Sequence, residues 1–182
     1  MRLYCPEGFA CDVTYGNGGF YKDIKPPKYK FDIDPQSDDV IAACSSAIPL
    51  PDAFLFSIVF DPPFLTYVRQ GRNHNSVMAK RFAGYWRYDE LSAHYIATLK
   101  EARRLLKKDG VLVFKCQDII HNHKMHCTHA NVIEWAKNVG FRLEDLFVLP
   151  VKHRMPIPPT QGHAAKIQRH ARIHHSYFLV FK

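Results

Sequence analysis

Short apolar runs alternate along this chain with stretches of helical periodicity, and this alternation restricts the fold more than any other feature. Residues 111–116 read as a central buried strand, and residues 57–60 as another that stops at Pro62-Pro63. Further strands are expected at residues 9–14, 29–33, 146–152 and 176–181. A chain of this kind builds an α/β domain whose sheet is mostly parallel.

Two helices are expected, at residues 91–108 and 128–139. The first carries one apolar stripe at steps of three and four, formed by Leu91, Tyr95, Leu99, Ala102 and Leu106. Lys107 and Lys108 suit its C-terminal dipole, and Gly110 and Gly140 are the expected stops. With the last two strands paired as an antiparallel hairpin, residues 1–182 are expected to form a single three-layer domain.

The net charge of +8 is unevenly distributed. Residues 1–61 carry a net charge of −4, residues 62–145 carry +6, and residues 146–182 carry another +6. The acidic first third suits a ligand that is not a polyanion, and the basic remainder suits nucleic acid. A solubilising surface is the alternative reading of the same charges.

Composition excludes several classes of protein. Hydrophobic content of 47% and charged content of 23% do not fit a collagen, a coiled coil or a disordered tail. The five cysteines are scattered and form no Cys-x-x-Cys, which favours a reducing cytoplasm over a disulfide framework. Because no apolar run approaches ~20 residues and the N-terminus is too polar for a signal peptide, no membrane association is expected.

The tetrapeptide Asp61-Pro62-Pro63-Phe64 directly follows a predicted strand, where ligands of parallel sheets bind. Its chemistry suits an exocyclic amino group, whose lone pair is delocalised into the base and must be redirected toward an electrophile. The Asp61 carboxylate and the Pro62 carbonyl can both accept hydrogen bonds from such a group, and the prolines fix the carbonyl direction. Phe64 offers a face for an extruded base. A strand-ending turn with a core Phe is the alternative.

The order of these pieces resembles the class I S-adenosylmethionine-dependent methyltransferases, and in particular the amino-methyltransferases that act on adenine in nucleic acids, including small bacterial and phage DNA methylases. The likeness covers nearly the whole chain and implies a Rossmann-like three-layer sandwich. It is carried by the segments at residues 12–18, 31–35, 48–52, 61–64, 104–115 and 170–181.

The resemblance implies a cofactor site for S-adenosylmethionine. The first-strand loop would contribute Asp12, Thr14, Gly16 and Gly18, and the next strand end would contribute Asp32, which would bind the ribose hydroxyls. Cys44 stands where the family often has an Asp that binds the adenine amino group, and Ser45 follows it; Asp61 would complete the set. Tyr21 stands where the dinucleotide motif needs a third glycine, which disfavours a nicotinamide enzyme.

One further departure from the family and two candidate nucleic-acid-binding segments complete the pattern. The short stretch between Phe20 and Pro26 leaves the usual first helix curtailed or absent. Basic and aromatic residues mix between residues 66 and 88, so Lys80, Arg81 and Tyr85 are predicted to bind nucleic acid, with a lid over the cofactor as the alternative. Arg169 and Arg172 are predicted to do so from the basic C-terminal stretch.

The predicted activity is transfer of a methyl group to the N6 amino group of adenine in DNA or RNA. Guanine-N2 or cytosine-N4 methylation is the alternative within the same chemistry, and a non-catalytic nucleic-acid-binding module is the alternative of another class. The histidines between His121 and His129 match no standard zinc spacing, so we expect a polar loop there and no metal.

Overall fold

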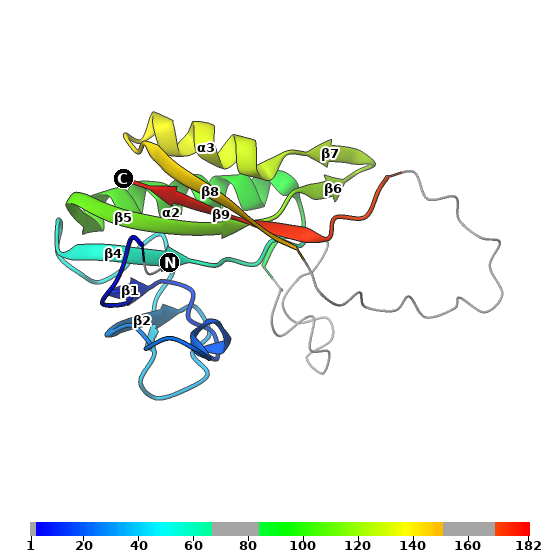
Figure 1. Ribbon diagram of the computed structural model, residues 1–182. Helices are drawn as coiled ribbons and strands as arrows, with labels where there is room; N and C mark the ends of the chain where they lie inside the picture. Colours follow the sequence, from blue (N-terminus) through cyan, green and yellow to red (C-terminus); the bar gives the residue numbers. More distant parts are fainter. Residues whose placement is uncertain (1–2, 67–83, 151–169) are drawn as a thin grey trace.

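The computed structural model describes residues 3–66, 84–150 and 170–182, and in this part of the chain one seven-stranded sheet packs against two α-helices (Figure 1). The strands lie in the order β3-β2-β1-β4-β5-β9-β8. Their bounds are β1 Cys11–Asp12, β2 Tyr29–Asp32, β3 Ile41–Ala42, β4 Leu55–Phe60, β5 Leu106–Cys116, β8 Leu143–Pro150 and β9 His175–Phe181.

Strand directions confirm the predicted fold class. The strands from β3 across to β5 pair in parallel, whereas β9 is antiparallel to both β5 and β8. The strand β1 pairs with β2 on one side and with β4 on the other, so the strand order reverses there. In open α/β sheets, ligands bind beyond the carboxyl ends of the strands at such a point.

Alternate side chains of the central strands face opposite sides of the sheet. Ile58 and Phe60 of β4 belong to a core that includes residues of α2 (Tyr88–Leu105) and α3 (Thr128–Asn138). Val59 of β4 and Val113 of β5 belong to a second cluster, with the N-terminal segment and the short 3-10 helix η1 (Gly19–Tyr21). This single 3-10 turn agrees with the predicted loss of the first helix.

The first long helix lies three residues earlier than predicted. Glu90 accepts hydrogen bonds from the backbone N–H groups of Trp86 and Arg87, which fixes the start of α2. The chain then becomes extended at Leu106, which pairs with Leu55 of β4 as the first residue of β5. The prediction that residues 106–108 are helical was therefore wrong, because burial of Leu106 between strands outweighs its helical spacing.

The histidine-containing segment also differs from the prediction. Instead of a loop, it forms a two-stranded hairpin of β6 (Ile119–His121) and β7 (Lys124–His126). Asn122 and His123 between them have φ of 50° and 59°, the left-handed conformation that suits a tight hairpin turn and that Asn tolerates well. Within the described residues, no group of three or more His, Cys, Asp or Glu side chains could hold a metal ion.

The sequence predicted which segments form strands better than it predicted where each strand begins and ends. β1 has two residues where six were expected, and β3 was not predicted. The helix α3 ends near Gly140, whose φ of +89° is the left-handed conformation of a helix stop. In the part of the chain that is described, neither helix has the length and apolar content that crossing a membrane requires.

Candidate functional site

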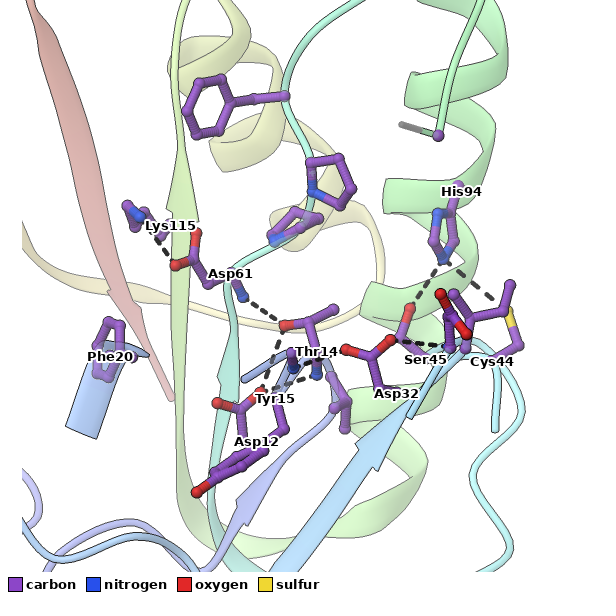
Figure 2. Close-up of a pocket in the computed structure, with 18 of the residues that line it drawn as sticks. Asp12, Thr14, Tyr15, Phe20, Asp32, Cys44, Ser45, Asp61, His94 and Lys115 are labelled. Carbon is purple, nitrogen blue, oxygen red and sulfur yellow. Dashed lines mark hydrogen bonds and ion pairs between the residues drawn. The ribbon is translucent and has the colours of Figure 1, made fainter. Parts of the chain in front are cut away.

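A cavity of about 1130 Å³ opens at the carboxyl ends of β1, β2, β3 and β4. Three sets of predicted site residues line it together, although they come from separate segments of the chain (Figure 2). They are the loop residues Asp12, Thr14 and Gly16, the strand-end residues Asp32, Cys44 and Ser45, and the tetrapeptide Asp61-Pro62-Pro63-Phe64. The sheet therefore brings the predicted cofactor and catalytic residues to one place.

Asp12 lies at the base of this cavity and is almost fully buried. One of its carboxylate oxygens accepts a 2.8 Å hydrogen bond from the backbone N–H of Thr14, and the other accepts a 2.7 Å bond from the hydroxyl of Tyr21. Burial raises the pKa of Asp12 to about 7, against the lowering effect of these hydrogen bonds. Asp12 thus shapes the loop that follows β1.

The glycine loop is fixed from the neighbouring strand. The backbone N–H of Gly16 donates a 2.7 Å hydrogen bond to Oδ2 of Asp32, at the end of β2. Oδ1 of Asp32 accepts a 2.9 Å bond from the N–H of Asp34. Gly16 has φ of +57°, and a Cβ at that position would meet no atom within 4 Å. The loop therefore presents backbone and an acidic side chain to open space, and it needs glycine for its conformation.

Two hydrogen bonds position the backbone of the tetrapeptide. The N–H of Asp61 donates to Oγ1 of Thr14 at 2.8 Å, which joins the end of β4 to the loop after β1. The hydroxyl of Tyr95, on α2, donates to the carbonyl of Pro63 at 3.1 Å. Tyr95 is fully buried, so this contact is well shielded from water. The backbone of this segment is consequently held at the N–H of Asp61 and at the carbonyl of Pro63.

The Asp61 carboxylate lies in an ion pair with Lys115. Nζ of Lys115, near the end of β5, donates to Oδ2 of Asp61 at 2.8 Å (Figure 2). The Lys115 side chain is 21% exposed and that of Asp61 is 24% exposed, so the pair lies at the cavity wall and in contact with water. Lys115 also lies 5.9 Å from the ring centroid of Phe178 on β9.

A polar network forms the opposite wall of the cavity. His94 of α2 lies within hydrogen-bonding distance of Ser45 Oγ, at 2.8 Å, and of the hydroxyl of Tyr85. Ser45 Oγ is also 2.9 Å from Thr98 Oγ1. Cys44 Sγ lies 4.0 Å from the same imidazole (Figure 2). Burial lowers the pKa of His94, which favours the neutral ring at physiological pH.

The remaining predicted site residues do not share one location. Gly18 lies in the glycine loop but does not line the cavity. A Cβ on Gly18 would lie 2.8 Å from the Tyr15 hydroxyl. Tyr85 lines the cavity, although it is largely buried and packs edge-on against Tyr95. Arg172 is exposed and away from the cavity lining, while Lys80, Arg81 and Arg169 lie outside the described residues.

The predicted site residues are also contacted by residues that were not predicted from the sequence to belong to the site, among them Tyr95, His94 and Lys115. Tyr95 was predicted only as part of the apolar stripe of the helix, and its hydroxyl gave no separate signal. His94 and Thr98 are four residues apart on one helix face, which is a weak sign of a polar contact. Lys115 had the clearest signal in the sequence, because its charge interrupts an otherwise apolar predicted strand that ends at the predicted site.

Comparisons with known proteins were made by sequence and by structure. No family model and no curated protein matches the sequence of this chain. Among solved structures, a SAM-dependent methyltransferase from Archaeoglobus fulgidus is 14% identical with a TM-score of 0.52, over 99% of this chain and 90% of that one. A chain from the complex between the Haloferax volcanii Trm112 methyltransferase activator and a methyltransferase is 17% identical with a TM-score of 0.54, over 94% and 79%.

A DNA modification methylase from Thermus thermophilus, complexed with S-adenosyl-L-methionine, is 22% identical over 74% of this chain, with a TM-score of 0.45. The present chain spans about half the length of that enzyme, since the match covers 49% of it. The two matches with TM-scores above 0.5 cover 94% and 99% of this chain. The chain therefore has the Rossmann-like fold of S-adenosylmethionine-dependent methyltransferases.

Proposed function

We propose that this chain transfers a methyl group from S-adenosylmethionine to an exocyclic amino group in nucleic acid, with N6 of adenine as the favoured target. One observation carries the proposal. The Asp61-Pro62-Pro63-Phe64 segment, fixed by Thr14 and Tyr95, borders the same cavity as the acidic strand end and the glycine loop. An amino-group acceptor thus stands beside a site that suits a nucleoside.

The residues of the cavity fit the cofactor. Asp32 has the carboxylate that a ribose diol requires, next to the open backbone of Gly16. The loop after β1 and the residues Cys44 and Ser45 after β3 would bind the remainder, with Cys44 in the place of a carboxylate. When bound, S-adenosylmethionine would supply an electrophilic methyl group, whose bond to the sulfonium sulfur breaks as the bond to the target nitrogen forms, so that a neutral thioether leaves. Neither a metal ion nor a covalent intermediate of the enzyme is required by this chemistry.

The residues of this chain would act by holding the nitrogen. The Asp61 carboxylate and the Pro62 carbonyl accept the two amino hydrogens, which turns the lone pair away from the ring and toward the cofactor side of the cavity. As the nitrogen becomes tetrahedral and gains positive charge, its hydrogen bond to the Asp61 carboxylate strengthens. The excess proton then leaves to the Asp61 carboxylate or to water. Positioning and electrostatic stabilisation together would provide most of the rate enhancement.

Incubation with isotopically labelled S-adenosylmethionine and separate pools of DNA and RNA tests the proposal. Mass spectrometry of the released nucleosides should show label in N6-methyladenine. Label in N4-methylcytosine or N2-methylguanine would keep the amino-group chemistry and change the base. A non-catalytic binding module would show no label in any base, and calorimetry with the cofactor would then show no saturable binding.

A further inference from the structure

Lys115 is the single Lys or Arg among the described residues that line the cavity. Four aspartates and one glutamate line it as well, so this wall is otherwise acidic. The placement follows from the pairing of β4 with β5, in which Phe60 is opposite Phe114. Asp61 and Lys115 each come one residue later, so both side chains project to the same face of the sheet.

An ion pair that remains in contact with water contributes little to folding stability, because water screens the attraction between the charges. The strand itself would accept an apolar residue at this position, because residues 111–114 are apolar and buried. Lys115 lies between the Asp61 carboxylate and the Phe178 ring, which restricts where its ammonium can point. Its position is thus better explained by the chemistry at the cavity than by stability.

We propose that Lys115 is a specificity-determining residue that holds the Asp61 carboxylate in place and donates a hydrogen bond to the ring nitrogen beside the target amino group. This inference rests on the proposed amino-methyltransferase function. A lysine ammonium has three donors, so the bond to Oδ2 of Asp61 leaves two others. Together, Asp61 and Lys115 present an acceptor beside a donor.

That arrangement is complementary to one edge of an amino-bearing base. In adenine, the N6 amino group is flanked by the lone pairs of N1 and N7, and in cytosine the N4 amino group is flanked by the lone pair of N3. The carboxylate would take the amino hydrogen while the ammonium takes the ring nitrogen. A keto group in the place of the amino group, as in hypoxanthine or uracil, would put oxygen against the carboxylate and be rejected.

The ammonium has a second effect, on the charge of Asp61. The buried carboxyl of Asp12, on β1, and the buried hydroxyl of Tyr95, on α2, both interact electrostatically with Asp61. Replacing Lys115 by a neutral residue removes the cation that forms an ion pair with Asp61 in the described part of the chain. The pKa of Asp61 should then rise, and less of the acceptor form would be present at neutral pH.

The test uses the full chain with Lys115→Met, which keeps the length and removes the charge, and Lys115→Arg, which restores the charge. Lys108→Met, at an exposed position of the same strand, is the matched control. Carbon-13 NMR of the aspartate carboxyls follows the titration of Asp61. The resonance of Asp61 is identified because it is absent from the spectrum of Asp61→Asn. We expect the Asp61 midpoint to rise by roughly one pH unit in Lys115→Met, and to return in Lys115→Arg.

The contact with the base is tested by turnover. Lys115→Met should lower kcat/KM on an adenine-containing oligonucleotide by on the order of tenfold to hundredfold, since the bond is charge-assisted. 1-Deazaadenine lacks N1 and 7-deazaadenine lacks N7, so one of these two bases should lack the nitrogen that Lys115 contacts. With that base, the loss of kcat/KM caused by the base and the loss caused by Lys115→Met should not add. If the product of the wild type is N4-methylcytosine, 3-deazacytosine takes their place.

The outcomes separate the inference from the proposed function. A wild type that methylates no amino group ends the proposed function and the base contact with it. The NMR measurement still decides the positioning role in that case, and an unshifted Asp61 midpoint in Lys115→Met overturns it. With an active wild type, losses that simply add for every deaza base overturn the base contact. Lys108→Met should match the wild type throughout.

Discussion

The backbone N–H of Gly16 donates a 2.7 Å hydrogen bond to the carboxylate of Asp32, and this contact joins the loop after β1 to the end of β2. One side chain therefore fixes the loop and faces the place proposed for the ribose. A carboxylate can accept hydrogen bonds on both oxygens in more than one direction, so the two roles are compatible.

Asp32→Ala is expected to weaken S-adenosylmethionine binding by about 1.5–3 kcal/mol, because it removes charged acceptors and releases the glycine loop. Isothermal titration calorimetry measures the change. Asp38→Ala, at an exposed position beyond the same strand, is the control and should bind as the wild type does. An unchanged affinity in folded Asp32→Ala would transfer the role to Asp34 or end the assignment.

The stability of the fold should depend on pH through Asp12. Burial raises its pKa in the folded protein to about 7 from the ordinary value of 3.8. Between these two values the folded state binds a proton that the unfolded state has released, so the contribution of Asp12 to stability falls as pH rises. This contribution is fully present below pH ~4 and is lost progressively up to the folded-state pKa.

Urea unfolding at pH 5, 6, 7 and 8 measures the effect. The wild type should lose free energy of unfolding relative to Asp12→Asn as pH increases over this range, because the amide does not titrate. A constant difference between the two proteins from pH 5 to 8 would contradict the raised pKa. Asp23→Asn, at an exposed position, is the control and should parallel the wild type.

Tyr95→Phe should lower kcat while leaving the fold in place. The change removes the hydroxyl that donates to the Pro63 carbonyl but keeps the ring that packs against Phe60 and Phe114. The expected loss is about 2- to 10-fold, the worth of one neutral hydrogen bond. Steady-state kinetics and cofactor titration together check it, and a loss confined to cofactor affinity would argue against positioning of the tetrapeptide.

The basic C-terminal residues provide a prediction about nucleic-acid affinity. Arg169→Ala with Arg172→Ala should weaken binding across sequences and make the slope of log K against log salt shallower by about 1–2, since each phosphate contact releases counterions. Binding in a salt titration measures this slope. Lys137→Ala, exposed on α3, is the control for a general change in charge. A double variant with the wild-type slope would assign this segment to a solvated surface.

The sequence allowed the central strands and the class of fold to be predicted because their signals are local. Runs of apolar residues identify β4 and β5, and a stripe of apolar residues identifies α2. β3 was missed because it has two residues with exposed side chains and carries no pattern. The limits of α2 were misjudged because the transition at Leu106 depends on pairing with Leu55, which is a tertiary contact.

The residues of the site also divide into those with a local sequence signal and those that depend on tertiary contacts. Asp32 and Asp61 were predicted at the cavity because each ends or follows a strand of a parallel sheet, and the fold brings such ends together. Their partners could not be predicted in this way. Lys115 meets Asp61 through the register of two strands, and Tyr95 reaches Pro63 through the packing of α2.

The central claim is that Asp61 presents an acceptor to an amino group of nucleic acid, and transfer of label by matched variants tests it most directly. The wild type, Asp61→Ala and the exposed control Asp23→Ala are incubated with labelled S-adenosylmethionine and nucleic acid, and methylated nucleosides are quantified by mass spectrometry. We predict N6-methyladenine from the wild type and the control, and a rate lower by on the order of a hundredfold in Asp61→Ala, with a much smaller loss of cofactor affinity. Full activity of Asp61→Ala on the base that the wild type methylates would contradict the account.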